Sequence, residues 1–387
     1  MRDFFVRFLA ITLLLSSFQV TAFAEEGKVQ LAKESSSAIL MERDTGAILF
    51  EKNSNEKLPP ASMTKIMTML LIMEALDQGK ITLDEKVRTS ERAASMGGSQ
   101  IFLEVGEEMT VEEMLKGIAI ASGNDASVAM AEHLAGSEEN FVIMMNDKAK
   151  SLGLSNTNFM NSNGLPAENH YTTAYDLAVI SKELLKYEDI LTYTSVYEDY
   201  LRQNTDKKFW LVNTNKLVKF YPGVDGLKTG YTREAKYCLT VTAKKNGMRV
   251  ITIVMGAQTP KDRNRQVTEM LDYAFSQYIT HKLYDRGHVI TTSKLSKGQK
   301  STVEVVTSES VSVLTKKGES IENVEEIVNL NKGLKAPIVK GDQLGTLRLE
   351  KEGTVLLEVP LVANEDIGVA TWWQLFKRTT AKFGGRS

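Results

Sequence analysis

The sequence predicts an α+β fold, in which an antiparallel sheet packs with helices and is followed by a small all-β region and a terminal helix. Residues 61–78 contain neither glycine nor proline, and the run 66–73 carries apolar residues on all sides, as expected for a buried helix. Asn246 and Gly247 lie between two β-branched runs, the strongest short-range signal for a β-hairpin. Because helices are predicted before and after these strands, including a closing helix at 266–275, the main domain is α+β.

A different pattern begins near Gly287. Segments at 302–305, 311–314 and 347–350 alternate apolar and polar residues and are separated by glycine-containing turns. This pattern predicts the half-buried strands of an all-β domain. A chain of 387 residues also suggests more than one domain. The predicted parts are a leader at 1–24, a main domain at 25–280, a β-rich domain at 281–363 and an amphipathic helix at 364–387.

The start of the buried helix carries a candidate reactive pair. Two prolines precede the helix and are tolerated there, so Ser62 and Lys65 fall on its first turn. Side chains three residues apart on a helix lie on one face and can touch. The alternative is a capping serine beside a solvated lysine. Ser54 and Lys57 have the same spacing but lie in a polar loop with no helix behind it, so we set them aside.

A second polar segment lies between two predicted helices. A capping box at 110–113 opens the first of them. Gly123 then breaks this helix, and Asn124 or Asp125 is expected to cap the next one. Ser122 and Asn124 therefore lie on a tight loop. Taken alone, this loop is better explained as a simple helix–helix turn.

A third polar segment, Lys228-Thr229-Gly230, shortly precedes the strands of the Asn246–Gly247 hairpin. We therefore expect it on or beside a strand of the antiparallel sheet. The other elements expected in the main domain are a hairpin at 38–51, helices at 141–152 and 174–185, and a loop at 156–170.

Composition and charge exclude several classes of function. The formal net charge is −2, so the sequence has no excess of positive charge of the kind that binds nucleic acid. Cys238 is the single cysteine, so no intrachain disulfide is possible, and the four histidines have no ligand-like spacing. We therefore expect no metal and no cofactor, and a Ser-His-Asp arrangement is not favoured.

The beginning of the chain has the pattern of a secretory signal peptide. Arg2 and Arg7 flank the start of an apolar run that is too short to span a bilayer. Residues 22–24 have the small-x-small form of a cleavage site, and cleavage is expected after Ala24. The mature protein is therefore expected outside the cytoplasmic membrane.

The last segment has the pattern of a helix that lies in a membrane interface. Its aromatic and apolar residues gather on one helical face, while basic residues lie mostly elsewhere. The alternative is a terminal helix docked on the β-rich domain. The apolar face comprises Val369, Trp372, Trp373, Phe376 and Phe383, and the basic residues are Lys377, Arg378, Lys382 and Arg386.

Together, the three polar segments resemble the signature of the penicillin-binding protein and serine β-lactamase superfamily. Ser-x-x-Lys begins a helix, Ser-Gly-Asn follows on a loop, and Lys-Thr-Gly follows on a strand. With glycine at the middle position of the second element, the chain resembles the low-molecular-mass D-alanyl-D-alanine carboxypeptidases of the S11 peptidase family. The resemblance covers nearly the whole chain and implies a penicillin-binding/β-lactamase-like transpeptidase domain.

The resemblance implies a catalytic role for three residues. Ser62 would be the nucleophile that forms an acyl-enzyme, and Lys65 would be its general base. A lysine acts as a base only when neutral, so its pKa must fall through desolvation and a neighbouring cation, which Lys228 could supply. Ser122 would relay a proton between Lys65 and the leaving group.

The resemblance also implies how a substrate is held. Asn124 would hydrogen-bond the substrate backbone, Lys228 and Thr229 would bind its terminal carboxylate, and Gly230 would let it lie close to the strand edge. The backbone N–H groups of Ser62 and Tyr231 would form an oxyanion hole. Arg263, by its spacing after the third element, is a further candidate for holding the carboxylate.

The implied function is removal of the terminal D-alanine from peptidoglycan stem peptides that end in D-Ala-D-Ala, with β-lactam antibiotics as covalent inhibitors. One alternative is a β-lactamase, although no convincing glutamate element lies between Ser122 and Lys228; Glu168 is in a loop there. A DD-endopeptidase and a non-catalytic wall-binding scaffold are the others. The implied location is the outer face of the cytoplasmic membrane, with the terminal helix as anchor.

Overall fold

The computed structural model describes residues 29–383, without the side chains of residues 379 and 381–383. The described residues from Ala32 onward belong to one compact unit. The expected signal peptide at 1–24 lies outside the described residues, as does Arg386, and the side chains of Lys382 and Phe383 are not described.

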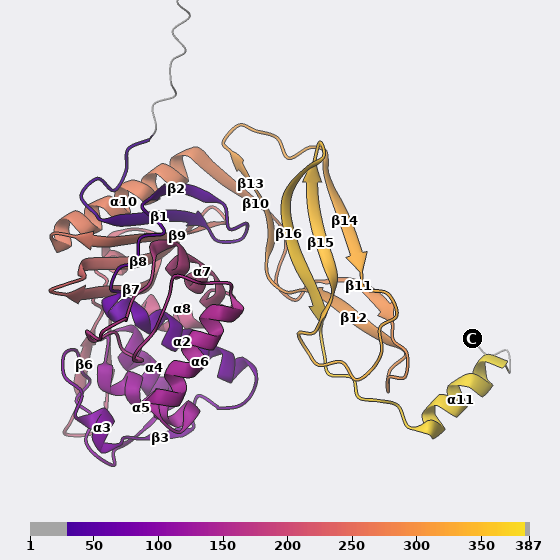
Figure 1. Ribbon diagram of the computed structural model, residues 1–387, viewed down its shortest axis with the longest axis horizontal. Coiled ribbons are helices and arrows are strands. Elements are labelled where there is room, and N and C mark those ends of the chain that lie inside the picture. The colour runs from indigo at the N-terminus through magenta and orange to yellow at the C-terminus, as the bar shows by residue number, and fades with distance from the viewer. Residues whose placement is uncertain (1–28, 384–387) are drawn as a thin grey trace, which may run out of the picture. The chain divides into compact units, whose positions relative to one another are not determined.

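A five-stranded antiparallel sheet with the strand order β2-β1-β9-β8-β7 organises the first part of the chain (Figure 1). The hairpin predicted at 38–51 is formed by β1 and β2, and the Asn246–Gly247 turn joins β8 to β9, so both hairpins are confirmed. Strand β7 is an edge strand, which leaves one of its sides free of a neighbouring strand. The five strands are β1 (Ser37–Glu42), β2 (Ile48–Lys52), β7 (Val224–Thr232), β8 (Lys236–Lys245) and β9 (Met248–Ala257).

Helices cover both faces of this sheet (Figure 1). On one face lies α10 (Pro260–Gln277), which is the predicted closing helix and is longer than the expected 266–275. The other face packs against α2 (Lys65–Asp77) and α7 (Ala174–Leu184). Further helices are α3 (Glu91–Ala94), α4 (Val111–Ala119), α5 (Asn124–Ala135), α6 (Glu138–Ser151), α8 (Leu191–Thr194) and α9 (Leu217–Phe220). Short elements beside them are η2 (Glu188–Ile190), β3 (Lys86–Arg88), β4 (Glu108–Thr110), β5 (Glu198–Leu201) and β6 (Phe209–Val212).

The helix predicted at 61–78 is buried, but it consists of two parts. Residues 61–64 form a 3-10 turn, η1 (Ala61–Thr64), and the α-helix begins only at Lys65. Ala61 enters this turn with φ +48°, a left-handed conformation that non-glycine residues rarely adopt. The tighter turn brings residues i and i+3 into an eclipsed position. It therefore aligns Ser62 directly with Lys65.

A second five-stranded antiparallel sheet, with the order β11-β12-β16-β15-β14, follows the first domain and has a core of its own (Figure 1). The predicted all-β character of this part is confirmed. A separate pair, β10 (Tyr278–Tyr284) and β13 (Val311–Lys316), spans the expected boundary between residues 280 and 281. The strands of the second sheet are β11 (Val289–Lys294), β12 (Thr302–Thr307), β14 (Val324–Leu330), β15 (Gln343–Lys351) and β16 (Thr354–Ala363).

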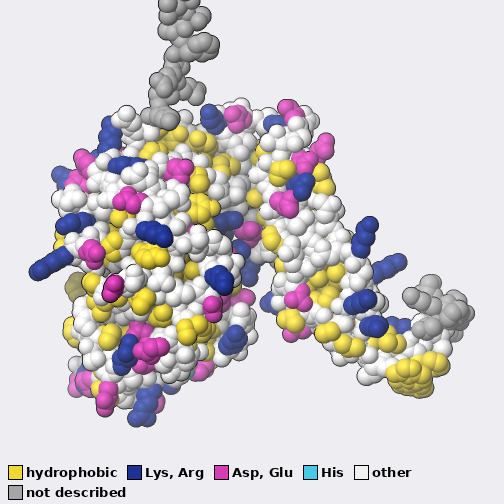
Figure 2. All heavy atoms as spheres, in the orientation of Figure 1, with side chains coloured by type: hydrophobic (Ala, Val, Ile, Leu, Met, Phe, Trp, Pro, Cys, Tyr) yellow, Lys and Arg dark blue, Asp and Glu magenta, His cyan; other side chains and the backbone are white. Residues whose placement is uncertain are grey.

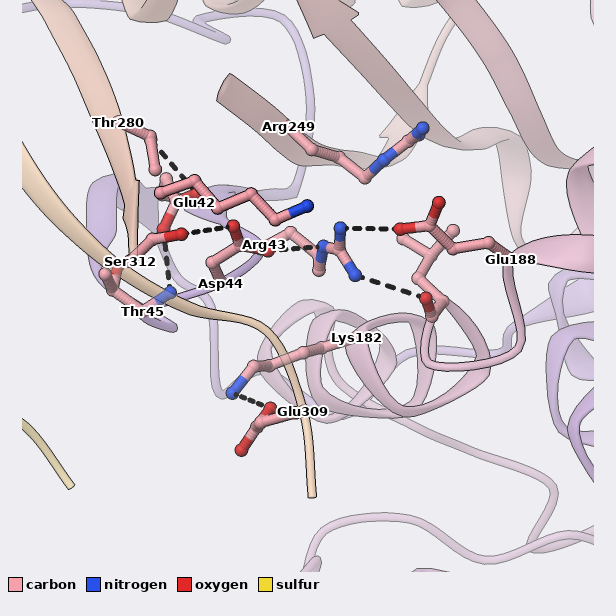
Figure 3. A network of polar contacts seen from close by, with 12 residues as sticks. Glu42, Arg43, Asp44, Thr45, Lys182, Glu188, Arg249, Thr280, Glu309 and Ser312 are labelled. Carbon is pink, nitrogen blue, oxygen red and sulfur yellow. Dashed lines mark hydrogen bonds and ion pairs between the residues drawn. The ribbon is translucent and has the colours of Figure 1, made fainter. Parts of the chain in front are cut away.

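A buried polar network connects the β1–β2 turn to this pair of strands (Figure 3). The Ser312 hydroxyl donates to Asp44 Oδ2 at 2.7 Å, and the Thr280 hydroxyl donates to Glu42 Oε1 at 3.2 Å. An ion pair between Lys182 and Glu309, 3.0 Å apart, adds a contact from α7. Because a buried polar group left without its partner is costly, these contacts disfavour separation of the two regions.

The terminal helix α11 (Trp372–Phe383) begins eight residues later than expected. Arg378 donates to the backbone carbonyls of Gly298, at 2.7 Å, and Gln299, so the helix is tied to the β region. Its two tryptophans nevertheless remain exposed, and Figure 2 shows apolar side chains gathered on this helix. Within residues 29–383, no helix is both long and apolar enough to cross a membrane.

Candidate active site

Ser62 and Lys65 meet at the junction between η1 and α2. Lys65 Nζ lies 3.2 Å from Ser62 Oγ. Ser62 is partly exposed, whereas Lys65 is completely buried beneath it. The contact that the three-residue spacing predicted is therefore formed, and the alternative of a solvated lysine is wrong.

Two further acceptors hold the Lys65 amine. Nζ donates to Asn124 Oδ1 and to the backbone carbonyl of Asn163, both at 2.6 Å. The prediction that Asn124 or Asp125 caps α5 with its side chain is wrong, because Gly123 occupies the N-cap position and provides no side-chain bond. The Asn124 side chain instead lies between Lys65 and the carbonyl of Gly97, to which Nδ2 donates at 2.7 Å.

The surroundings of the two site lysines lower their pKa values. Burial, and secondarily the charge of Lys228, hold the pKa of Lys65 well below its ordinary value, while the Asp125 carboxylate raises it. Burial and then the Arg263 guanidinium lower the pKa of Lys228 to about 7. Lys65 is therefore neutral over a wider pH range than an exposed lysine, as a general base must be.

The third polar segment lies on the edge strand β7, as predicted. Lys228 is buried and its Nζ donates to the Thr229 carbonyl at 3.1 Å. The Thr229 hydroxyl donates to Thr214 Oγ1 at 2.7 Å, which ties the strand to the segment after β6. A Cβ atom on Gly230 would lie 2.9 Å from the Pro60 carbonyl oxygen, so packing of β7 against η1 already requires glycine there.

Ser122 lies in the loop that joins α4 to α5. It is buried and has φ +66°, a left-handed conformation that is uncommon for serine and is often found at functional sites. Within residues 29–383, its hydroxyl makes no hydrogen bond to Ser62 or Lys65. The structure thus brings Ser62 and Asn124 into hydrogen-bonding contact with Lys65. Lys228 lies close enough for its charge to lower the pKa of Lys65.

The sequence did not reveal the loop at 161–164 as part of the site. The Asn163 carbonyl accepts from Lys65, and the loop is held by Glu138, which accepts from the Ser162 backbone N–H at 3.0 Å and from its hydroxyl at 2.8 Å. Gly164, at φ +87°, lies so close to η1 that a Cβ atom would be 1.9 Å from the Ala61 carbonyl oxygen. The succession of asparagines and a glycine in this loop is a turn signal, but it does not point to Lys65.

This site combines a partly exposed serine hydroxyl, a buried lysine of lowered pKa and a cationic strand edge. Such an arrangement is typical of acyl-transfer enzymes that use a serine nucleophile. The similarity of this protein to known families and structures agrees with this class. A family profile described as D-alanyl-D-alanine carboxypeptidase matches residues 23–259, and one described as the C-terminal domain of penicillin-binding protein 5 matches residues 278–369. The chain belongs to the D-alanyl-D-alanine carboxypeptidase family, peptidase family S11.

Curated relatives match over nearly their full length. D-alanyl-D-alanine carboxypeptidase DacF of Bacillus subtilis is 63% identical over 374 residues, which cover 96% of each chain. D-alanyl-D-alanine carboxypeptidase DacC of Escherichia coli is 34% identical over 359 residues, covering 90% of this chain and 88% of the relative.

A solved structure matches as well. Penicillin-binding protein 5 of Haemophilus influenzae has a TM-score of 0.67 and 31% identity, covering 88% of this chain and 98% of that one. The predicted fold class and the predicted enzyme, a D-alanyl-D-alanine carboxypeptidase and serine hydrolase, are confirmed.

Proposed function

We propose that Ser62 attacks the carbonyl carbon of the penultimate D-alanine of a peptidoglycan stem peptide, with Lys65 as the base. The observation that carries this proposal is the position of a buried Lys65 amine 3.2 Å from a partly exposed Ser62 hydroxyl. Attack forms an ester to Ser62 and breaks the peptide bond, and the terminal D-alanine leaves as the amine. Water then hydrolyses the ester and frees Ser62.

The hydrogen bonds of Lys65 support its role as a base. A neutral amine has two N–H groups and one lone pair. The two short bonds, to Asn124 Oδ1 and the Asn163 carbonyl, use both N–H groups. The lone pair is then left for Ser62 Oγ, in the direction needed to accept the hydroxyl proton.

Lys228, Thr229 and Asn124 are proposed to hold the substrate. The Lys228 ammonium and the Thr229 hydroxyl lie on the edge strand, where an extended peptide can align beside them, and a charge-assisted hydrogen bond to a carboxylate is a strong one. Gly230 lets β7 pack closely against η1, which keeps this strand edge beside Ser62. The backbone N–H groups of Ser62 and Tyr231 would receive the negative charge that develops on the carbonyl oxygen, and such a donor typically contributes about 2.7–4 kcal/mol.

Ser122 is proposed to pass a proton between Lys65 and the leaving amine. It is buried and lies two residues before Asn124, whose side chain contacts Lys65. Departure of the amine requires a proton at the nitrogen, and Lys65 holds that proton after it has accepted it from Ser62. A hydroxyl group both donates and accepts, which suits it to this transfer.

The same acylation step would trap a β-lactam antibiotic on Ser62. A relative of known structure, penicillin-binding protein D2 of Listeria monocytogenes, was solved in its ampicillin-bound form and is 30% identical, covering 64% of this chain. Glu168, the glutamate weighed for a β-lactamase, is exposed. A carboxypeptidase that is acylated by penicillin is therefore favoured over an enzyme that hydrolyses it rapidly.

The substrate assignment is tested by measuring released D-alanine. The protein should release one D-alanine from a pentapeptide that ends in D-Ala-D-Ala, should not cleave the same peptide ending in D-Ala-L-Ala, and should become labelled by fluorescent penicillin. Rapid turnover of a chromogenic cephalosporin would instead indicate a β-lactamase. Absence of both labelling and release would indicate a non-catalytic wall-binding protein.

The pH dependence of kcat/KM should depend on the charge of Lys228. Its pKa of about 7 in the free enzyme means that the ammonium is present below pH 7 and is lost above it. Because carboxylate binding needs the cation, kcat/KM of the wild type should fall as the pH rises through about 7. In Lys228→Arg the guanidinium stays charged, so this alkaline decline should disappear even if the maximum is lower.

A matched control for this profile is Lys182→Arg, which changes a half-buried lysine that pairs with Glu309 instead. Its kcat/KM profile from pH 5 to 10 should follow the wild type. An unchanged alkaline limb in Lys228→Arg would contradict the carboxylate-binding role.

We also propose that the protein is exported by the expected signal peptide and is held on the outer face of the cytoplasmic membrane by α11. Trp372, Trp373 and Phe376 stack on one another and are 71%, 57% and 45% exposed. Aromatic side chains of this kind bury favourably at a lipid–water interface. Arg378, by contrast, ties the helix to the β region through Gly298 and is not free for lipid contact.

Vesicle sedimentation tests the membrane proposal. Replacing Trp372, Trp373 and Phe376 together by alanine should lower the fraction bound to anionic phospholipid vesicles by about tenfold or more, because three apolar contacts are lost. Trp210→Ala is the control, since Trp210 is 55% exposed on β6, and it should bind as the wild type does. Equal binding of the triple variant would support the alternative, a helix docked on the β region.

A further inference from the structure

A chain of hydrogen bonds leads from the loop at 156–170 to the peptide that precedes the nucleophile. The Met160 backbone N–H lies 3.0 Å from His170 Nδ1, and His170 Nε2 lies 2.8 Å from Thr64 Oγ1. The Thr64 hydroxyl in turn contacts the Ala61 carbonyl oxygen at 2.9 Å. His170 and Thr64 are both buried. Thr64 lies between Ser62 and Lys65 in the sequence, but neither its side chain nor that of His170 has a role in the site described above.

The chemistry of the bonded groups decides which is donor and which is acceptor in each of these hydrogen bonds. A backbone N–H can only donate, so His170 Nδ1 must be the acceptor and carry no proton. The neutral ring then has its proton on Nε2 and donates it to Thr64 Oγ1. The Thr64 hydroxyl proton is thereby left for the Ala61 carbonyl. Burial agrees with a neutral ring, because it lowers the pKa of His170 to about 4.

The Ala61 carbonyl belongs to the same peptide unit as the Ser62 N–H. A trans peptide unit is planar, and its C=O and N–H groups point in opposite directions. Fixing the carbonyl on one side therefore fixes the direction of the N–H on the other. Ser62 lies in the first turn of η1, where backbone N–H groups have no acceptor within the helix. Among residues 29–383, the Ser62 N–H makes no backbone hydrogen bond, so it is available to a ligand.

Three other features constrain this peptide unit and the His170 ring. Ala61 has the left-handed φ of +48°, which needs support from its surroundings. Gly164 packs so closely against Ala61 that any side chain at position 164 would overlap the Ala61 carbonyl oxygen. Phe159 contacts the His170 ring edge to face at 5.9 Å between centroids, which restricts the ring to one orientation.

We propose that His170 and Thr64 are positioning residues for acyl transfer, which hold the Ala61–Ser62 peptide so that the Ser62 N–H points at the developing oxyanion. The inference rests on the proposed role of Ser62. Besides orienting the peptide, a hydrogen bond to its carbonyl polarises the unit and strengthens its N–H as a donor. This series of hydrogen bonds therefore stabilises the transition state more than it stabilises the bound substrate.

The test compares variants by acylation and by transition-state binding. Thr64→Val keeps the shape of the side chain and removes the hydroxyl, so it breaks the last bond of the chain. Its kcat on a D-Ala-D-Ala peptide and its rate of acylation by penicillin should fall by about 10- to 100-fold with little change in KM. Affinity for a boronic acid analogue of the acyl group, which forms a tetrahedral adduct with Ser62, should fall by the same factor.

Two substitutions of His170 separate positioning from packing. His170→Gln offers an acceptor and a donor at comparable separation and should keep kcat within about threefold of the wild type. His170→Phe keeps the ring and loses both bonds, so it should match Thr64→Val. Because both changes interrupt one chain, the double variant Thr64→Val/His170→Phe should be scarcely worse than either single variant.

The control is Thr194→Val, which removes a buried threonine hydroxyl that donates to the Asp225 carbonyl at 2.7 Å in the same domain. It should lower the unfolding temperature much as Thr64→Val does and leave the affinity for the boronic acid unchanged. The inference is overturned if Thr64→Val is acylated at the wild-type rate, if its loss lies in KM alone, or if His170→Gln behaves like His170→Phe. A wild-type protein that forms no adduct at Ser62 would overturn the proposed function, and the inference with it.

Discussion

Ser62→Ala is expected to lose carboxypeptidase activity by roughly 10⁴- to 10⁶-fold, because removing the nucleophile of an acyl-transfer enzyme leaves only the catalysis supplied by binding and by the oxyanion hole. The variant should also form no covalent adduct with penicillin. The helix should be undisturbed, since Ser62 makes no cap within η1. Released D-alanine and labelling by fluorescent penicillin provide the two measurements.

Ser54→Ala is the matched control for this variant. Ser54 begins the other Ser-x-x-Lys sequence of the chain and is buried, but its hydroxyl donates to Glu51 and not to a lysine. The control should keep the wild-type kcat/KM and remain labelled by penicillin. Labelling of Ser62→Ala at the wild-type level would exclude Ser62 as the nucleophile.

Lys65→Met is expected to reduce kcat by about 10²- to 10⁴-fold, the usual contribution of a general base. Methionine fills much of the same buried space but cannot accept the Ser62 proton. Lys65→Arg provides a second test, because its guanidinium can donate to Asn124 and Asn163 but stays protonated and cannot act as a base. Both variants should therefore be slow in acylation, which stopped-flow measurement with a chromogenic β-lactam would show.

Lys57→Met is the control for the lysine variants. Lys57 is exposed and lies over the Tyr171 ring, 4.7 Å from its centroid, so its loss should leave acylation unchanged. Acylation of Lys65→Arg at a rate near the wild type would show that the base is another group.

Much of the site could be predicted because its parts have local signals. The spacing of Ser62 and Lys65 on a buried helix predicted their contact, which is formed at 3.2 Å. The hairpin around Asn246 and Gly247 predicted a sheet beside Lys228, which lies on edge strand β7. In both cases the periodicity of one element decides where the side chain lies.

The parts that escaped prediction depend on contacts between segments far apart in the chain. The Asn163 carbonyl is a backbone atom, which any residue could provide, and it lies 98 residues from Lys65. Asn124 had the residue type of a helix cap, but it lies within α5, after the Gly123 N-cap, and its side chain accepts a hydrogen bond from the distant Lys65 amine. His170 gave no signal, because its partners are a backbone N–H and a threonine.

The most direct measurement is mass spectrometry of the protein after brief reaction with a pentapeptide ending in D-Ala-D-Ala and quenching in acid, and of the protein treated with penicillin. We expect the substrate adduct to have the mass of the pentapeptide without its terminal D-alanine, and both adducts to lie on the proteolytic peptide that contains Ser62. An adduct on a different residue, or release of D-alanine by a protein whose Ser62 is never acylated, would contradict the assignment of Ser62 as the acylated nucleophile.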